Sequence, residues 1–546
     1  MTFMDRDKQP VAWAPSPGSE RSTGSEGPPE ATASKRPMPS WVRTSLESLW
    51  AARWRGIAAA LGLAITWGLV AAWWTPRGPL TTSEALWSMT ICLAVGGLAG
   101  LMMRSRWAAL ITPLAFAATF ELARLGVSGP TVDGIETSFY GLMALVVGRG
   151  FHALVSLVWL ALGALLGAAL ARALGSTRDG DRPESGRART YAGRIAAVSI
   201  ALVFVATFAV LAQPASTDPI VDANGDEVVG SVAELTTVEA NGHDLALLIR
   251  GHSVDNPVLL FLAGGPGGSE MGSMRNHLPG LEEHFTVVTW DQRGAGKSYP
   301  ELDPTDTISL DGYVDDTVVV TDYLRDRFDQ DRIYLLGQSW GSTLGILAAQ
   351  QHPERYRAFI GTGQMVSQRA SDRIFYEDTL AWAKENGDSD LVAELESIGP
   401  PPYERMLGYE TSNSHEQSVY AYDHSMNSEG QGQMSENIIA DEYTLIDEVH
   451  ILGAFLDTFA ALYPQLQEID FRQTATEFEV PMFFAQGAHE ADGRAEPFAE
   501  WYPMIEAPIK ELVTLDTSGH RPLFEQPDEF VEFMVDTVLA RTSPTV

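Results

Sequence analysis

The pattern of apolar residues divides the chain into two regions with different periodicity. Between residues 56 and 212 there are five long apolar segments, at 56–74, 85–103, 107–122, 151–171 and 195–212. A transmembrane helix needs ~20 apolar residues, and most of these segments approach that length, although the third is short and contains Pro113. From about residue 231 the apolar runs become short and alternate with helical patterns. The first region therefore predicts about five membrane helices, with an added interfacial piece at 140–147, and the second predicts a folded α/β domain.

The composition of the flanking segments sets the expected domain boundaries. Residues 1–40 are rich in Pro, Ser, Gly and Glu and poor in large apolar side chains, which is typical of disorder. We expect a disordered cytoplasmic tail at 1–50, the transmembrane region at 51–213 and a linker at 214–230. The α/β domain then occupies 231–546.

The basic residues beside the apolar segments predict the orientation in the membrane, because cytoplasmic loops are enriched in Lys and Arg. On the side of the N-terminus lie Lys35, Arg36, Arg43, Arg53, Arg55, Arg104, Arg106, Arg172, Arg178, Arg182, Arg187, Arg189 and Arg194. The alternate loops hold only Arg77, Arg124 and Arg149. With five spans, the N-terminus is cytoplasmic and the α/β domain extracytoplasmic. With four or six spans, that domain would be cytoplasmic. The predicted side of the α/β domain therefore depends on whether the short third segment crosses the membrane.

The two regions also differ in charge. Residues 1–212 hold 19 Lys and Arg against 13 Asp and Glu, whereas residues 213–546 hold 18 against 58. So acidic a domain disfavours nucleic acid as a partner. Solubility or salt tolerance explains the acidity, and attraction of cationic substrates is the alternative. The single cysteine, Cys92, excludes an intrachain disulfide.

Short strands and helices alternate through the acidic region. A hairpin is predicted from runs at 234–239 and 244–250 around Asn241-Gly242. Further strands are predicted at 257–262, 285–290, 332–336, 357–361, 480–485 and 511–515, with a helix at 309–325. This alternation favours a mostly parallel sheet that helices cover on both faces. The long stretch at about 368–478 has few strand signals and is expected to form an inserted helical cap above the substrate pocket.

A nucleophile elbow is predicted at residues 337–341, which read G-Q-S-W-G. An apolar run that predicts a strand precedes this pentapeptide, and a helical pattern follows it. A strand, a sharp turn and a helix would expose the hydroxyl of Ser339 as a nucleophile.

The other groups that acyl transfer requires are found downstream. His520 follows the last strand and is the candidate general base. Glu490 follows the preceding strand and is our choice for the acid that orients His520, with Asp492 as the rival. For the oxyanion we expect the N–H of Trp340 and an N–H from the glycine-rich loop after the strand at 257–262, with Gly265 preferred and Gly264 second.

Two other patterns bear on cofactors. Residues 294–298 resemble the end of a phosphate-binding loop, but Asp291 stands where the first glycine is required. The histidines show no metal-ligand spacing such as H-E-x-x-H. We therefore expect no metal and no organic cofactor.

These motifs together resemble the proline iminopeptidase-like branch of the α/β-hydrolase superfamily. The matching residues are G-G-P-G at 264–267, W-D-Q-R-G-A-G-K-S at 290–298, G-Q-S-W-G at 337–341 and S-G-H at 518–520. The resemblance covers about residues 230–540 and implies an α/β-hydrolase fold. The chain departs from the family at Ala263, where a His is usual, and at Glu490, where an Asp is usual. In peptidases of this branch, cap carboxylates hold the free amine of the substrate, and this cap offers Asp423, Glu436, Asp441, Glu442 and Glu448.

The sequence therefore predicts a membrane-anchored serine hydrolase whose catalytic domain lies outside the cytoplasm. The first hypothesis for its activity is an aminopeptidase acting on short peptides, as the resemblance implies. Ester hydrolysis is the second hypothesis, and a membrane sensor with an inactive hydrolase fold is the third.

Overall fold

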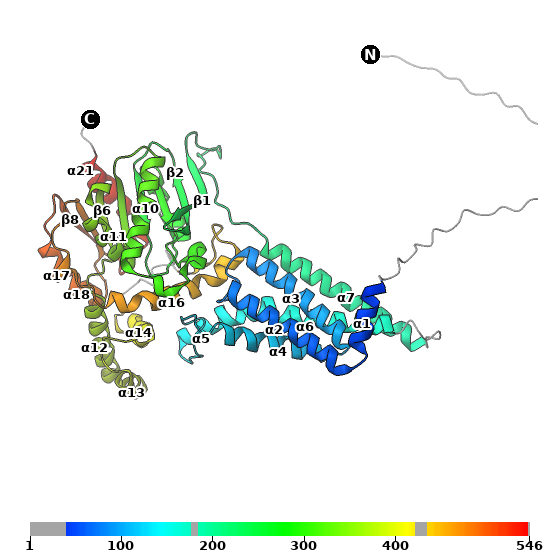
Figure 1. Cartoon of the computed structure of the whole chain (residues 1–546). Coiled ribbons are helices and arrows are strands. Elements are labelled where there is room, and N and C mark those ends of the chain that lie inside the picture. Colours follow the sequence, from blue (N-terminus) through cyan, green and yellow to red (C-terminus); the bar gives the residue numbers. More distant parts are fainter. Residues whose placement is uncertain (1–39, 176–183, 421–433, 544–546) are drawn as a thin grey trace, which may run out of the picture. The chain divides into compact units, whose positions relative to one another are not determined.

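The computed structural model describes residues 40–175, 184–420 and 434–543 (Figure 1). Residues 1–39 of the expected disordered tail therefore lie outside the described part of the chain. Residues 40–50, which the composition assigned to the same tail, form helix α1 (Ser40–Trp50). Most of α1 belongs to a separate N-terminal unit that ends at Ser48, and the chain from Leu49 onward forms the second unit.

Among the described residues, four helical stretches are long and apolar enough to cross a membrane: Arg53–Trp74, Thr82–Met103, Phe139–Leu174 and Gly193–Leu211. The elements of this region are α2 (Arg53–Trp74), α3 (Thr82–Met103), α4 (Ala108–Ala123), α5 (Phe139–Leu145), the π-helical turn η1 (Val146–Gly150), α6 (Phe151–Gly175) and α7 (Glu184–Leu211). The piece expected at 140–147 is continuous with the fourth segment, because η1 joins α5 to α6.

The third expected membrane segment forms the shorter apolar helix α4. At 1.5 Å per residue, its 16 residues extend ~24 Å, less than the ~30 Å of a bilayer core. Four of the five expected membrane segments thus form helices long and apolar enough to cross a bilayer, and the third forms a short apolar helix. Of the basic residues that predicted the orientation, Lys35, Arg36, Arg178 and Arg182 lie outside the described residues.

Helices α3 and α6 pack closely through two G-x-x-x-G motifs. A Cβ atom added at Gly96 or Gly100 would lie 2.1 or 2.0 Å from backbone oxygens of α6. A Cβ atom at Gly163 or Gly167 would lie 2.2 or 1.8 Å from backbone oxygens of α3. Small residues at these positions allow the two backbones to approach, as in many helix pairs within membranes.

The predicted α/β domain is built on one eight-stranded sheet in the order β1-β2-β4-β3-β5-β6-β7-β8. Its strands are β1 (Val232–Ala240), β2 (His243–Gly251), β3 (Val258–Leu262), β4 (Thr286–Trp290), β5 (Ile333–Gln338), β6 (Tyr356–Thr362), β7 (Met482–Gly487) and β8 (Lys510–Leu515). The predicted hairpin is confirmed, since Ala240 pairs with His243 and both turn residues have positive φ. Strands β1 and β2 are antiparallel to their neighbours, and the strands from β4 to β8 are parallel, as expected.

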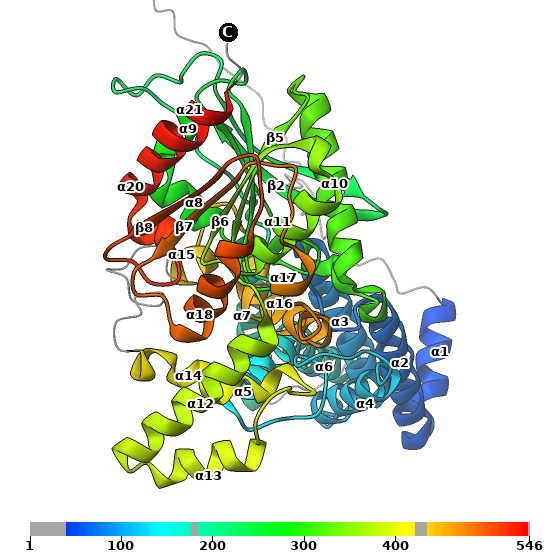
Figure 2. The ribbon, with the colours of Figure 1, turned by 90° about the vertical axis from the view of Figure 1, so that its left-hand side faces the viewer.

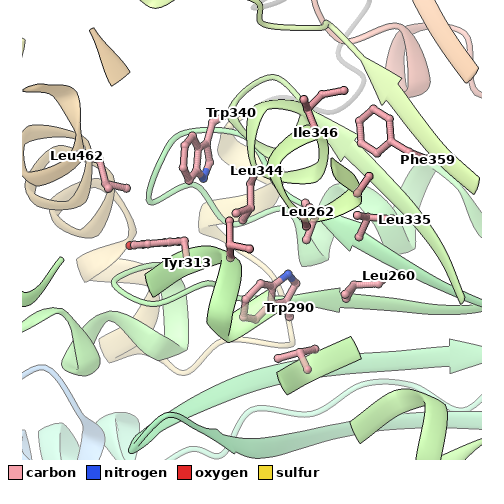
Figure 3. Close-up of a cluster of buried hydrophobic side chains, with 14 of the residues drawn as sticks. Leu260, Leu262, Trp290, Tyr313, Leu335, Trp340, Leu344, Ile346, Phe359 and Leu462 are labelled. Carbon is pink, nitrogen blue, oxygen red and sulfur yellow. The ribbon is translucent and has the colours of Figure 1, made fainter. Parts of the chain in front are cut away.

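Helices cover both faces of the sheet (Figure 2). One face carries α10 (Leu310–Arg327) and α11 (Trp340–Gln351) over a core that includes Leu260, Trp290 and Leu335 (Figure 3). The other face is covered by α8 (Met271–His277), α9 (Pro279–Glu282), α19 (Pro522–Glu525), α20 (Pro527–Glu532), η8 (Phe533–Leu539) and α21 (Ala540–Thr542). Shorter elements are η3 (Gly296–Leu302), η4 (Thr305–Thr307), η5 (Pro353–Arg355), α18 (Asp492–Trp501) and η7 (Tyr502–Met504).

The inserted cap is helical and lies between β6 and β7. It comprises α12 (Gln368–Asn386), α13 (Ser389–Ile398), η6 (Met406–Gly408), α14 (Glu410–Val419), α15 (Met434–Ile438), α16 (Leu445–Leu466) and α17 (Phe471–Thr474). Its longest helix, α16, starts with a capping box in which Thr444 and Asp447 exchange hydrogen bonds between side chain and backbone. Two such bonds satisfy backbone donors that a helix start leaves free.

A buried ion pair joins the cap to the region of apolar helices. Arg77, in the loop between α2 and α3, donates to Asp457 of α16 at 2.5 Å and to Asp303 at 2.9 Å. Thr131 and Tyr299 also donate to Asp457. The side chains of Arg77 and Asp457 are only 1% and 0% exposed, so each depends on the other for charge compensation.

Candidate active site

The structure places Ser339 at a sharp turn between β5 and α11. Its backbone has φ 54° and ψ −120°, a region that non-glycine residues rarely occupy. Steric constraints require glycine on both sides of this turn. A Cβ atom at Gly337 would lie 2.4 Å from the carbonyl oxygen of Gly341, and a Cβ atom at Gly341 would lie 1.9 Å from the carbonyl oxygen of Leu262. The sequence G-x-S-x-G thus folds into a strained turn that places Ser339 at the carboxyl end of a central strand, as the predicted nucleophile elbow requires.

His520 lies in the loop after β8, beside Ser339. Its Nε2 atom is 3.0 Å from the Ser339 hydroxyl oxygen. Its Nδ1 atom is 2.7 Å from Oε2 of Glu490. Glu490 accepts the Nδ1 proton, and this bond leaves Nε2 free to accept the proton of Ser339. Gly363, with φ 51°, supports the imidazole from behind, because a Cβ atom there would lie 3.0 Å from two of its ring atoms.

The partner of His520 is Glu490, and the rival Asp492 is the first residue of α18. The Glu490 side chain is only 4% exposed. Its second oxygen, Oε1, accepts from the Ala491 N–H at 3.0 Å and from Arg494 Nε at 2.7 Å. Both carboxylate oxygens of Glu490 therefore accept hydrogen bonds. These bonds fix the plane of the carboxylate relative to the imidazole of His520.

The glycine-rich loop after β3 lies beside Ser339. Gly264 donates its N–H to Glu270 at 3.1 Å, so this N–H is engaged within the loop. Gly265 has φ 127° and lines a cavity together with Ser339 and Trp340. Trp340 is the first residue of α11, and the N–H groups of a first helical turn have no intrahelical acceptor. The arrangement thus favours Gly265 over Gly264 as the second oxyanion donor.

Gln292, in the W-D-Q-R-G motif, connects these two parts of the site. Its side-chain oxygen accepts from the Trp340 indole at 2.8 Å, and its amide donates to the carbonyl of Ala263 at 3.2 Å. The sequence did not predict this role of Gln292, although the motif that contains it is part of the resemblance. Its position two residues after the end of β4, at the same edge of the sheet as Ser339, was the signal that could have indicated it.

The cavity above Ser339 is small and has no carboxylate in its lining. Its volume is about 30 Å³, enough for about two water molecules. The lining residues are Gly265, Pro266, Ser339, Trp340, Thr343, Met365, Val366, Ser367, Gln368, Leu466 and Ile469.

None of the four described cap carboxylates that the resemblance singled out lines this cavity. Glu436 pairs with His277, and the buried Glu442 pairs with Arg275. Asp441 is exposed, and Glu448 is half-buried beside Asp447. The remaining candidate, Asp423, lies outside the described residues.

Asp372 of α12 is a cap carboxylate that the sequence did not single out. It accepts hydrogen bonds from Tyr463, Gln467 and the cavity-lining Gln368. Burial raises the pKa of Asp372 to about 6, although these three donors oppose the shift. It therefore lies one side chain away from the cavity.

A second buried carboxylate, Asp291, holds the loop that contains Gln292. It accepts from the Lys297 N–H at 2.8 Å and from the Tyr443 hydroxyl at 3.0 Å. Burial raises its pKa to about 7, above the value of about 4 in an unfolded chain. The protonated form is thus favoured by folding, so its contribution to stability is complete below pH ~4 and is lost as the pH rises through ~7.

This linkage gives a testable difference between the wild-type protein and the Asp291→Asn variant. We expect the Tm of the wild-type protein to fall relative to that of Asp291→Asn as the pH rises from ~4 to ~8, because only the wild type must lose a buried proton. Thermal unfolding of both proteins in the same detergent measures it. Parallel curves of Tm against pH would contradict the assigned burial effect.

Comparison with known proteins identifies the family of the α/β domain. Residues 257–527 match the family described as alpha/beta hydrolase fold. The probable aminopeptidase YbaC of Bacillus subtilis (strain 168) is 29% identical over 303 residues, which cover 55% of this chain and 94% of that protein. A probable proline iminopeptidase of Leptolyngbya boryana is 33% identical over 132 residues, which cover 24% of this chain but only 39% of that protein. A crystal structure of a proline iminopeptidase-related protein from Thermus thermophilus has a TM-score of 0.41 at 20% identity, covering 58% of this chain and 100% of that one.

Residues 257–527, about half of the chain, thus belong to the α/β-hydrolase family. The protein is a hydrolase, and the predicted resemblance to proline iminopeptidase-like proteins is confirmed. The fold class is confirmed as well, with a mostly parallel sheet and apolar N-terminal helices long enough to span a membrane.

Proposed function

We propose that the chain is a membrane-anchored serine hydrolase with Ser339, His520 and Glu490 as its catalytic triad. The observation that carries this proposal is the continuous series of contacts from Glu490 through His520 to the Ser339 hydroxyl, at 2.7 and 3.0 Å. No other pair of acid and base competes for Ser339 among the described contacts.

In the proposed mechanism, His520 Nε2 takes the proton of Ser339 as its oxygen attacks the substrate carbonyl. The negative charge that develops on the carbonyl oxygen is stabilised by the N–H groups of Trp340 and Gly265. Glu490 keeps the imidazole oriented and stabilises it while it is charged. His520 then protonates the leaving group, and a water molecule activated by the same base releases the acyl group.

The ends of the apolar helices support an extracytoplasmic catalytic domain. The indole of Trp50, before α2, donates to the carbonyl of Leu101 near the end of α3, and α4 starts a few residues later. At its other end, α4 is followed by Arg124, which donates to the carbonyl of Pro76 just after α2. Helix α4 therefore returns the chain from the side where α2 starts toward the side where α2 ends, although it has only 16 residues. We infer that it is a fifth crossing, which puts the start of α2 and the hydrolase on opposite sides.

The charges at the two ends agree with this topology. At the hydrolase end, Arg77 pairs with Asp303 and Asp457, and Arg124 and Arg149 pair with Glu121. The hydrolase end therefore carries only these three arginines among the described loops, whereas the opposite end carries more, including Arg53, Arg55, Arg104, Arg106 and Arg172. The positive-inside rule then assigns the opposite end to the cytoplasm.

Two substrate classes remain, and a different observation favours each of them. The aminopeptidase and proline iminopeptidase names of the relatives favour an amine-bearing peptide, and Asp372, which accepts from the lining residue Gln368, is the carboxylate that we expect to hold the amine. The absence of any carboxylate from the described lining favours a neutral acyl group, as in small esters. We place aminopeptidase activity first.

A substrate panel separates the two classes. We expect the wild-type protein to hydrolyse aminoacyl-naphthylamides, and Asp372→Asn to raise KM for these amines several-fold while leaving KM for nitrophenyl esters within about twofold. Steady-state kinetics of both variants on both substrate series measures this split. Turnover of esters with no turnover of amides would replace the peptidase proposal by an esterase.

A further inference from the structure

Arg494 connects the proposed triad acid to the cap. It lies one helical turn after Glu490, and its Nε atom donates to Glu490 Oε1 at 2.7 Å. Its two terminal nitrogens both contact the carboxylate of Glu416 on α14, with Nη1 at 3.2 Å from Oε2. One guanidinium thus joins two carboxylates that lie on different parts of the domain.

This group of three charges is shielded from solvent. The side chains of Glu490, Arg494 and Glu416 are 4%, 6% and 10% exposed. The guanidinium also lies 5.1 Å from the ring centroid of Phe375 on α12. The planar fork of an arginine fits two carboxylates at once, which an ammonium group cannot do.

Helix α14 is itself held against the region of apolar helices. Glu410, its first residue, accepts from the backbone N–H of Tyr140 at 2.9 Å. Asn413, one turn later, donates to the Tyr140 hydroxyl at 2.6 Å. The position of Glu416 is therefore fixed by contacts with α5, and Glu416 in turn fixes the guanidinium that Glu490 needs.

We propose that Arg494 is a positioning residue for the hydrolytic reaction and that Glu416 of the cap holds it in place. Arg494 acts on the reaction only through Glu490, because it fixes the carboxylate plane that orients His520. This inference rests on the proposed triad. It adds that the cap helix α14 contributes to the alignment of the triad.

The test compares variants by the rate at which a fluorophosphonate labels Ser339 and by kcat and KM on p-nitrophenyl butyrate. We expect Arg494→Gln to lower the labelling rate and kcat at least about tenfold, with KM changed less than about threefold. Arg494→Lys keeps one charged donor and should recover part of kcat. Glu416→Gln should have a smaller effect, and adding it to Arg494→Gln should change little, because Glu416 acts only through Arg494.

The control is Arg275→Gln, which breaks another Arg–Glu pair, between α8 and the buried Glu442 of the cap, whose described contacts include no triad residue. It should lower Tm like Arg494→Gln but leave the labelling rate near that of the wild type. Equal labelling rates for Arg494→Gln and the wild type would overturn the inference while leaving the triad intact. Absence of labelling in the folded wild-type protein would instead contradict the proposed function itself.

Discussion

Replacing His520 with alanine is expected to lower kcat by at least about 10⁴-fold with little change in KM. The reason is that Ser339 loses the only base that the described contacts place within hydrogen-bond distance, 3.0 Å from its hydroxyl, and a neutral serine hydroxyl is a weak nucleophile. Removal of one member of such a triad usually costs nearly as much as removal of all three. Steady-state kinetics on a nitrophenyl ester, with Ser339→Ala measured in parallel, checks this result.

Two neighbouring carboxylates supply a matched control for the same experiment. Glu490→Gln is expected to lower kcat by about 10³–10⁴-fold, because an amide can favour the wrong tautomer of His520. Asp492→Asn should stay within about threefold of the wild type, since His520 bonds Glu490. The opposite order of effects would make Asp492 the acid and would contradict the assignment of Glu490.

The second large effect concerns stability. Arg77→Met is expected to destabilise the protein by about 3–5 kcal/mol, because it leaves the fully buried Asp457 without its counter-charge. For a domain of this size, the loss corresponds to a fall in Tm on the order of 10 °C. Thermal unfolding of the full chain in detergent measures this fall.

Comparison of three variants tests whether the loss of stability arises from the buried ion pair. Arg77→Met combined with Asp457→Asn should be more stable than Arg77→Met alone, because the buried negative charge is then removed as well. Arg369→Met should change Tm little, since the pair between Arg369 and Glu468 is 49% and 76% exposed. A loss of stability in Arg77→Met no larger than in Arg369→Met would show that the buried pair does not hold the cap against the apolar helices.

The sharp turn at Ser339 could be predicted from the sequence because its determinants are local. The glycines at 337 and 341 are required by contacts with backbone atoms of the same turn and of the adjacent strand β3. The positions of the strands along the chain were similarly indicated by the alternation of short apolar runs with helical patterns. The sequence also preferred Glu490 to Asp492 from its place just after a strand, and the side-chain geometry adds its contact with His520.

The features that the sequence did not indicate depend on contacts between distant segments. Arg77 and Asp457 are 380 positions apart, and nothing in their own surroundings in the sequence marks them as partners. Arg494 has a weak local signal, since it lies four residues after Glu490, but its second partner, Glu416, is 78 positions away. The length of α4 was visible in the sequence, yet its course beside α2 depends on how the helices pack.

The measurement that tests the central proposal most directly is the labelling of Ser339 by a membrane-impermeant fluorophosphonate in intact cells. We predict an adduct on Ser339, identified by peptide mapping, that forms without lysis and is absent from His520→Ala. Labelling that appears only after lysis would contradict the extracytoplasmic position of the catalytic domain. A folded wild-type protein that shows no adduct even after lysis would contradict the proposal that this chain is a serine hydrolase.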